Sequence, residues 1–183
     1  MKIYTVFPGT RTCREVKRLY LSAFPAEERY PFGRLWLLSA LKSRVALRAY
    51  GDGDAFCGFT LTVDSGKYLY ISFIAVAPEV RSRGYGAQML ELLRQGYPER
   101  ALLVEVEAPE ETSPNCGQRV RRIDFYRKNG FHDLDRTITG RGVTYALLST
   151  DTDFDREAYW KIFDQLSLGL GPWLRRLKKR LGR

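Results

Sequence analysis

A basic turn with two glycines is the stretch of this sequence best suited to hold an anion. It runs from Arg81 to Ala87, RSRGYGA, between an apolar segment and a run with helical spacing. Gly84 and Gly86 have no Cβ, so a ligand can approach the backbone closely and φ can be positive. A helix that begins here directs unpaired N–H groups and the positive end of its dipole to the turn, where two arginines add charge. The turn is therefore predicted to bind an anion, and a pyrophosphate suits it.

Three other interpretations compete for this turn. A P-loop is excluded because no Gly-Lys-Ser/Thr follows at the required spacing. A dinucleotide-binding fingerprint fits the two glycines and an acid at Glu105, but it needs a third glycine where the chain has Met89. Its turn should also follow the strand directly, whereas residues 78–83 intervene. The third alternative is a glycine turn that only caps a helix and binds no ligand.

The pattern Arg81-x-x-Gly84-x-Gly86, after a strand and a proline, resembles the acetyl-CoA pyrophosphate loop of the GCN5-related N-acetyltransferases (GNAT). A second segment, Phe125–Phe131, is similar to the Tyr-x-x-x-Gly-Phe segment of that family. The resemblance covers roughly residues 1–150. It implies an N-acetyltransferase that moves an acetyl group from acetyl-CoA to a primary amine by direct attack, with general base and general acid assistance.

The resemblance also implies which residues hold acetyl-CoA. Backbone groups of residues 74–76 would pair with the pantetheine arm, with one N–H facing the thioester oxygen, where a preorganised donor stabilises developing negative charge. The asparagine in the loop before a later helix resembles one that often touches the pantetheine chain. The complete set is Ile74, Ala75, Val76, Arg81, Ser82, Arg83, Gly84, Tyr85, Gly86, Ala87 and Asn115.

Acetyl transfer to an amine needs a base, because an amine that resembles lysine has a pKa of ~10.4 and is almost entirely protonated at pH 7. Glu105 and Glu107 stand two apart on one expected strand, hence on the same face, and their mutual repulsion is expected to raise the pKa of one of them. By resemblance Glu105 matches the base of some family members, and which glutamate acts stays open. Tyr126 is the candidate acid, because a phenol can protonate a thiolate. The alternatives are glutamates that face solvent and a tyrosine that only fills the core.

The acceptor amine is not identified by the sequence. Glu27 and Glu28 could receive a cationic acceptor, since the family places the connection between its first two helices at the acceptor pocket; exposed, solvated charge is the default explanation for such a pair. A small amine, an amino acid, a peptide N-terminus and a lysine side chain all stay open. His132 is the only histidine and the three cysteines are scattered, so no metal-ligand set stands out and no metal is expected.

The elements that position these residues follow from hydrophobic periodicity and from proline and glycine breaks. Their order, β α α β β β α β α β β, is that of the GNAT family and predicts an α/β (α+β) fold with a mixed central sheet of about seven strands and flanking helices. The expected strands are Lys2–Phe7, Arg44–Tyr50, Ala55–Asp64, Tyr68–Ala77, Ala101–Glu107, Phe131–Thr139 and Val143–Ser149, and the expected helices run from Thr10 or Thr12 to about Phe24, after Pro31, from Gly84 to about Tyr97 and from about Gln118 to Asn129.

Length and charge divide the chain into a transferase domain, 1–150, and a C-terminal extension, 151–183. The net charge is +9, and six basic residues of an acid-free tail leave only +3 for the rest. The extension is predicted to form a helix from about Arg156 to Leu166 and then a basic amphipathic segment. That segment could pack on the domain or on a second subunit in a homodimer, or bind an anionic membrane surface or RNA. The six basic residues are Arg175, Arg176, Lys178, Lys179, Arg180 and Arg183.

Two other functions stay open: a non-catalytic acyl-CoA-binding sensor, and an RNA- or ribosome-associated module that acts through the tail. Three cysteines without paired spacing fit a reducing cytoplasm, and a cytoplasmic location is expected. No apolar run approaches the ~20 residues needed to span a membrane.

Overall fold

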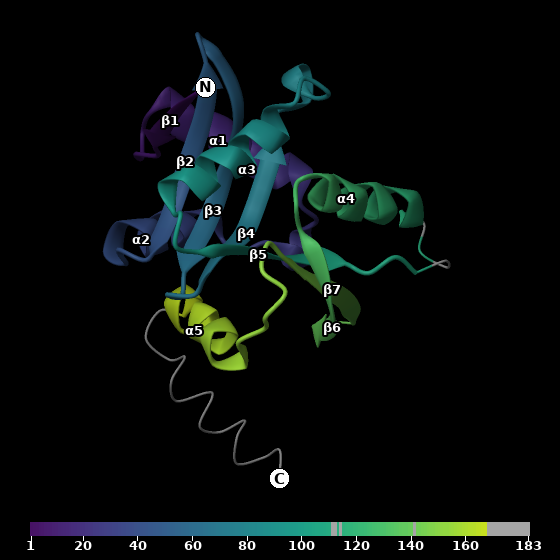
Figure 1. The fold of residues 1–183 in the computed structure, drawn as a ribbon. Coiled ribbons are helices and arrows are strands. Elements are labelled where there is room, and N and C mark those ends of the chain that lie inside the picture. Colours follow the sequence, from purple (N-terminus) through teal and green to yellow (C-terminus); the bar gives the residue numbers. More distant parts are fainter. Residues whose placement is uncertain (111–112, 114, 141, 168–183) are drawn as a thin grey trace.

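The fold is described from a computed structural model that defines residues 1–110, 113, 115–140 and 142–167. Figure 1 shows one twisted sheet with helices on both of its faces. The basic segment predicted after residue 171 lies outside the described residues, and its contacts stay predictions. The elements are β1 Lys2–Thr5, α1 Arg11–Ala23, η1 Ala26–Glu28, α2 Phe32–Leu41, β2 Val45–Asp52, β3 Ala55–Asp64, β4 Tyr68–Val76, η2 Pro78–Val80, α3 Tyr85–Gly96, β5 Ala101–Glu107, α4 Cys116–Lys128, β6 His132–Gly140, β7 Val143–Ser149 and α5 Arg156–Leu166.

The sheet has seven strands in the order β1-β2-β3-β4-β5-β7-β6. The pair β4 and β5 is parallel, and the other neighbouring strands are antiparallel. A parallel pair needs a crossover, and α3 supplies it. The predicted mixed α/β fold and its order of elements are confirmed.

The parallel pairing in the middle of the sheet stops after three residues. Strand β4 pairs with β5 from Tyr68 to Tyr70, yet β4 continues to Val76 and β5 continues to Glu107. Beyond that point β4 stays bonded to β3, and β5 stays bonded to β7. A bulge at Ser72, which has no partner on β3, bends β4 just where the two strands part. Figure 1 shows the two strands running apart, which opens the sheet from within.

Two apolar clusters hold the helices on the sheet. The larger one joins the inner faces of α1 and α2 to the sheet, with Tyr20 and Leu35 fully buried. The other one packs Leu90 of α3 and Ile123 of α4 against β5 and its neighbours. No helix in the described part of the chain is long and apolar enough to cross a membrane.

Helix α5 lies beyond residue 150, yet it is built into the larger cluster. Asp155 caps it by accepting hydrogen bonds from the backbone N–H groups of Glu157 and Ala158, and this bonding lowers the pKa of the Asp155 carboxyl. Its inner face is buried against β3 and β4. The buried residues of α5 are Ala158, Tyr159, Ile162 and Leu166.

We expect Ile162→Ala to lower the free energy of unfolding by about 2–5 kcal/mol, because the truncation leaves a cavity where the side chain is fully buried. In a chain of this length the melting temperature should fall by roughly 5–15 °C. The matched control is the neighbouring exposed residue, Lys161→Ala, which should change stability by less than ~0.5 kcal/mol. Equal melting temperatures for the two variants would contradict the packing of α5 on the sheet.

Candidate active site

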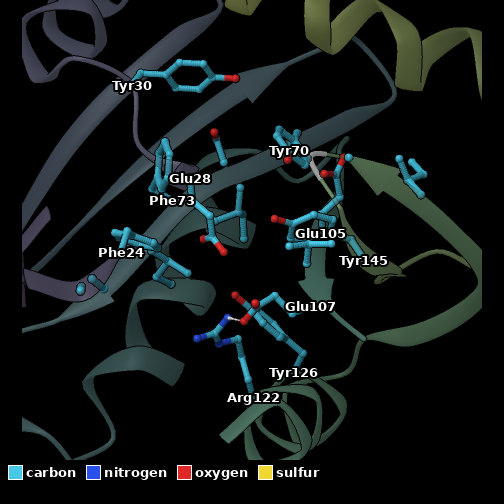
Figure 2. Close-up of a pocket in the computed structure, with 18 of the residues that line it drawn as sticks. Phe24, Glu28, Tyr30, Tyr70, Phe73, Glu105, Glu107, Arg122, Tyr126 and Tyr145 are labelled. Carbon is cyan, nitrogen blue, oxygen red and sulfur yellow. Dashed lines mark hydrogen bonds and ion pairs between the residues drawn. The ribbon is translucent and has the colours of Figure 1, made fainter. Parts of the chain in front are cut away.

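The opening between β4 and β5 forms a pocket of about 600 Å³. Its walls come from both strands, from η1 and the end of α1, from α4, from β7 and from α5. In Figure 2, Glu105 and Tyr145 lie on the side of β5 and β7, and Phe24 and Phe73 lie opposite them. One edge of β4, from Ile71 to Val76, faces this opening without a strand partner on that side. The pocket therefore combines free backbone groups, carboxylates and aromatic rings.

The glycine turn has the backbone geometry of an anion cradle. Gly84 has φ 79° and is the N-cap of α3, and Ser82 has φ 62°, which is uncommon for a residue with a side chain. Within the described residues, none of the six backbone N–H groups from Ser82 to Ala87 donates to an acceptor of the protein. Arg81 also lines the pocket, and its Nε donates to the carbonyl of Val76 at 3.4 Å. Unpaired N–H groups and positive charge thus meet at the start of a helix.

Gly86 is needed for packing as well as for access to the backbone. A Cβ at this position would lie 3.1 Å from the ring of Phe125 and 3.5 Å from Val76 Cγ2. The glycine therefore lets α3 approach α4 closely across the mouth of the opening. At Gly84, in contrast, a Cβ would meet nothing within 4 Å, so the positive φ is what favours glycine there.

Glu105 forms no ion pair with a cationic side chain among the described residues, although it lines the pocket. The Tyr159 hydroxyl donates to its Oε1 at 2.7 Å. Burial raises the pKa of Glu105, while the hydroxyls of Tyr159 and Tyr70 act in the opposite direction. A carboxylate with a raised pKa beside an open pocket has the properties of a general base.

Glu107 has a different environment, although it lines the same pocket. Its Oε1 accepts a hydrogen bond from Arg119 Nη2 at 3.0 Å, and its Oε2 lies 3.4 Å from Arg122 Nη1. The expectation that the pKa of one of the two glutamates is raised is confirmed for Glu105, but the cause is burial and not repulsion by Glu107, which is paired with two arginines. Arg119 Nε also donates to Asn115 Oδ1 at 2.9 Å. Asn115, the residue predicted to contact pantetheine, is thus held at the start of α4.

Tyr126 is buried on α4, between the rings of Phe125 and Phe131, and it lines the pocket. Burial raises its pKa to about 12, so it carries its proton at neutral pH. Tyr145 of β7 also has a pKa raised to about 12, by burial first and then by the negative charges of three glutamates, Glu28, Glu107 and Glu105. Tyr145 therefore also carries its proton at neutral pH.

The predicted acceptor residues lie on η1, at the edge of the pocket. Glu28 lines it together with the rings of Phe24 and Tyr30. The side chain of Glu27 lies outside what the structure describes. A cationic amine that entered here would meet one carboxylate and several aromatic faces, which both favour positive charge.

A search of protein families gives one match, the acetyltransferase (GNAT) domain, over residues 42–133. The matched half of the chain contains the glycine turn, both candidate bases and Tyr126. The chain belongs to the GNAT family. No curated protein matches it by sequence.

Solved GNAT structures share the fold. A GNAT-family protein from Bacteroides thetaiotaomicron superposes with a TM-score of 0.71, at 22% identity, over 86% of this chain and 90% of that one. An aminoglycoside 6′-N-acetyltransferase solved with coenzyme A gives 0.63 at 11% identity, over 85% and 99%. A family member from Elizabethkingia anophelis with acetyl-CoA bound gives 0.53 at 17% identity, over 82% and 97%.

Several pocket residues of this GNAT protein were missed by sequence reasoning, among them four aromatic residues, Tyr70, Tyr145, Tyr159 and Phe163. Tyr70 and Tyr145 lie on expected strands, and period-2 alternation marks them only as facing one side of the sheet. Tyr159 and Phe163 lie in the expected helix of the extension, from about Arg156 to Leu166, for which the sequence predicts no role in the site. No local pattern could have revealed that α5 reaches the pocket, because the contact joins residues 54 positions apart.

Proposed function

We propose that the chain is an acetyl-CoA-dependent N-acetyltransferase that acetylates a primary amine by direct attack. The observation that carries the proposal is the shared opening of the sheet: an anion cradle, a free strand edge and a partly buried carboxylate all face it. We keep 1–150 as the transferase unit and 151–183 as its extension. The solved relatives with coenzyme A or acetyl-CoA bound support the choice of co-substrate.

The N–H groups from Ser82 to Ala87 would hold the pyrophosphate, with Arg81 and Arg83 adding charge. The free edge of β4 at residues 74–76 would bind the pantetheine arm and place one N–H against the carbonyl oxygen that becomes negative. Asn115 would support that arm from the start of α4. Bound acetyl-CoA would supply the activated acetyl group.

The proton steps fall to two residues of the pocket. Glu105 would take a proton from the ammonium form of the acceptor, because a raised pKa makes its carboxylate a stronger base. Glu107 is the weaker candidate for this role, because two arginines already neutralise it. Tyr126 would donate its phenol proton to the departing thiolate. The usual pKa of a thiol lies below the usual pKa of a phenol. Glu28, with Glu27, would attract the acceptor's positive charge.

Calorimetry with CoA and a thiol-release assay over a panel of amines test the function. We expect CoA to bind at least tenfold more tightly than pantetheine, which lacks the pyrophosphate, and at least one amine to release free thiol from acetyl-CoA. Replacing Arg81 and Arg83 by alanine should weaken CoA binding more than tenfold and leave pantetheine binding unchanged. Arg18→Ala, at an exposed site on α1, is the control. Binding of CoA without thiol release would favour the acyl-CoA sensor, and no binding would refute the proposal.

We expect Glu105→Gln to abolish the acid limb of the kcat/KM profile that arises from titration of the free enzyme. Below the pKa of Glu105 the carboxyl is protonated and cannot accept a proton, so activity falls as pH falls, and this limb should lie above the usual glutamate pKa of ~4.3. Glu107→Gln should keep the limb and lower the melting temperature, because it weakens a largely buried ion pair. If only Glu107→Gln loses the acid limb, the base is Glu107 and not Glu105.

We expect Tyr126→Phe to lower kcat by about 10²–10⁴-fold with little change in the KM for acetyl-CoA, because it removes a proton donor used late in the reaction. The ring contacts with Phe125 and Phe131 remain, so the melting temperature should change by only a few degrees. Steady-state kinetics beside thermal unfolding distinguish the two effects. Unchanged kcat would assign Tyr126 to the core alone.

A further inference from the structure

The C-terminal helix reaches the candidate base from outside the part of the chain that the family shares. The family match ends at residue 133, and α5 begins at Arg156. The Tyr159 hydroxyl nevertheless donates to Glu105 Oε1 at 2.7 Å, and Tyr159 is 2% exposed. Tyr159 and Phe163 both line the pocket. The extension therefore forms part of its wall.

Both ends of α5 are tied to the rest of the fold. At its start, the Tyr68 hydroxyl on β4 donates to the carbonyl of Asp153 at 3.0 Å and accepts from the backbone N–H of Asp155 at 2.7 Å. At its end, side chains from α2 and from the residue after it donate to backbone carbonyls: Arg34 Nη2 to Leu166 at 2.8 Å and Lys42 Nζ to Ser167 at 2.7 Å. The position of Tyr159 is therefore fixed from two sides.

The Tyr159 ring is also held laterally. It lies 5.2–5.7 Å, between ring centroids, from the rings of Phe154, Trp160 and Phe163. Burial first, and then the negative charge of Glu105, raises the pKa of Tyr159 well above its usual range. Tyr159 thus keeps its proton and acts as a donor to Glu105 at every pH relevant to catalysis.

We propose that Tyr159 is a positioning residue: α5 delivers its hydroxyl to Glu105 and so holds the base in the orientation and charge state that catalysis needs. The inference rests on the proposed function, since it assumes that Glu105 is the base. A phenol that donates to a carboxylate stabilises its charged form, which opposes the effect of burial. It also fixes the orientation of one carboxylate oxygen of Glu105.

The tyrosines around Glu105 keep their protons in the pH range where a carboxyl titrates. Tyr70 of β4 has a pKa raised well above its usual range, and the pKa values of Tyr145 and Tyr126 are raised to about 12. Glu107, on the same strand, is paired with Arg119 and with Arg122 of α4. Glu28 of η1 and Arg81 complete the charged groups that line the pocket. A change in the acid limb on removal of the Tyr159 hydroxyl therefore reports on Glu105.

The test is Tyr159→Phe, which keeps the ring and removes the hydroxyl. We expect the acid limb of kcat/KM to move to higher pH by about one unit, because the charged form of Glu105 loses a hydrogen bond. Below the limb, activity should fall about tenfold, and the Kd for CoA should stay within twofold. The control is Tyr50→Phe, which removes another buried hydroxyl, one that bonds to Thr60 at 3.0 Å and does not line the pocket; it should lower the melting temperature and leave the limb in place.

A second measurement does not depend on turnover. Carbon-13 NMR of glutamate-labelled protein, with Glu105→Gln to assign the signal, gives the pKa of the Glu105 carboxyl directly. We expect this pKa to rise in Tyr159→Phe by the same amount as the kinetic limb. An unchanged carboxyl pKa, or an equal shift of the limb in Tyr50→Phe, overturns the role of Tyr159. A raised carboxyl pKa with an unmoved limb overturns it as well, because Glu105 is then not the base, whereas absence of thiol release by the unaltered protein overturns the proposed function itself.

Discussion

The rest of the site depends on the early end of the parallel ladder between β4 and β5. Three paired residues join the halves of the sheet, after which each strand keeps only its outer partner. A continuous ladder would use the inner edge of β4 for strand pairing and would leave no pocket. Next to the gap, at Val76 on the end of β4, Gly86 lies close to the ring of Phe125, which lets α3 and α4 pack against each other. The inner edge of β4 thus keeps backbone N–H and C=O groups that must form hydrogen bonds with water or with a ligand.

Two glutamates on alternate positions of β5 show how one strand can present two carboxylates with different chemistry. Glu107 lies beside Arg119, and this largely buried ion pair holds β5 and α4 together. Glu105 receives hydroxyl donors in place of cations, so burial raises its pKa. Because their partners differ, Glu107 has a structural role and Glu105 is able to accept a proton.

The parts of the site that follow from local chemistry were predicted from the sequence, and those that depend on long-range contacts were not. Glycine at a positive φ and a helix start leave a local signature, so the turn at Gly84 was found. The environment of Glu105 was not, because it is set by Tyr159 from a distant helix. The arginine pair on α4 was detectable in principle: Arg119 and Arg122 are three residues apart and share a helix face. Their partner could be identified only once α4 was placed against β5.

The division of the pocket along the chain explains why family membership leaves the acceptor undefined. The matched residues, 42–133, include the turn, the free edge of β4 and the candidate base and acid. Other parts of the wall come from segments outside that range: η1 with Glu28, β7 with Tyr145 and α5 with Tyr159. If the shared part holds the co-substrate and moves protons, the surrounding segments decide which amine fits. Selectivity for the acceptor then resides in three separate pieces of chain, and α5 links it to the stability of the core because the same helix fills the cluster beneath the sheet.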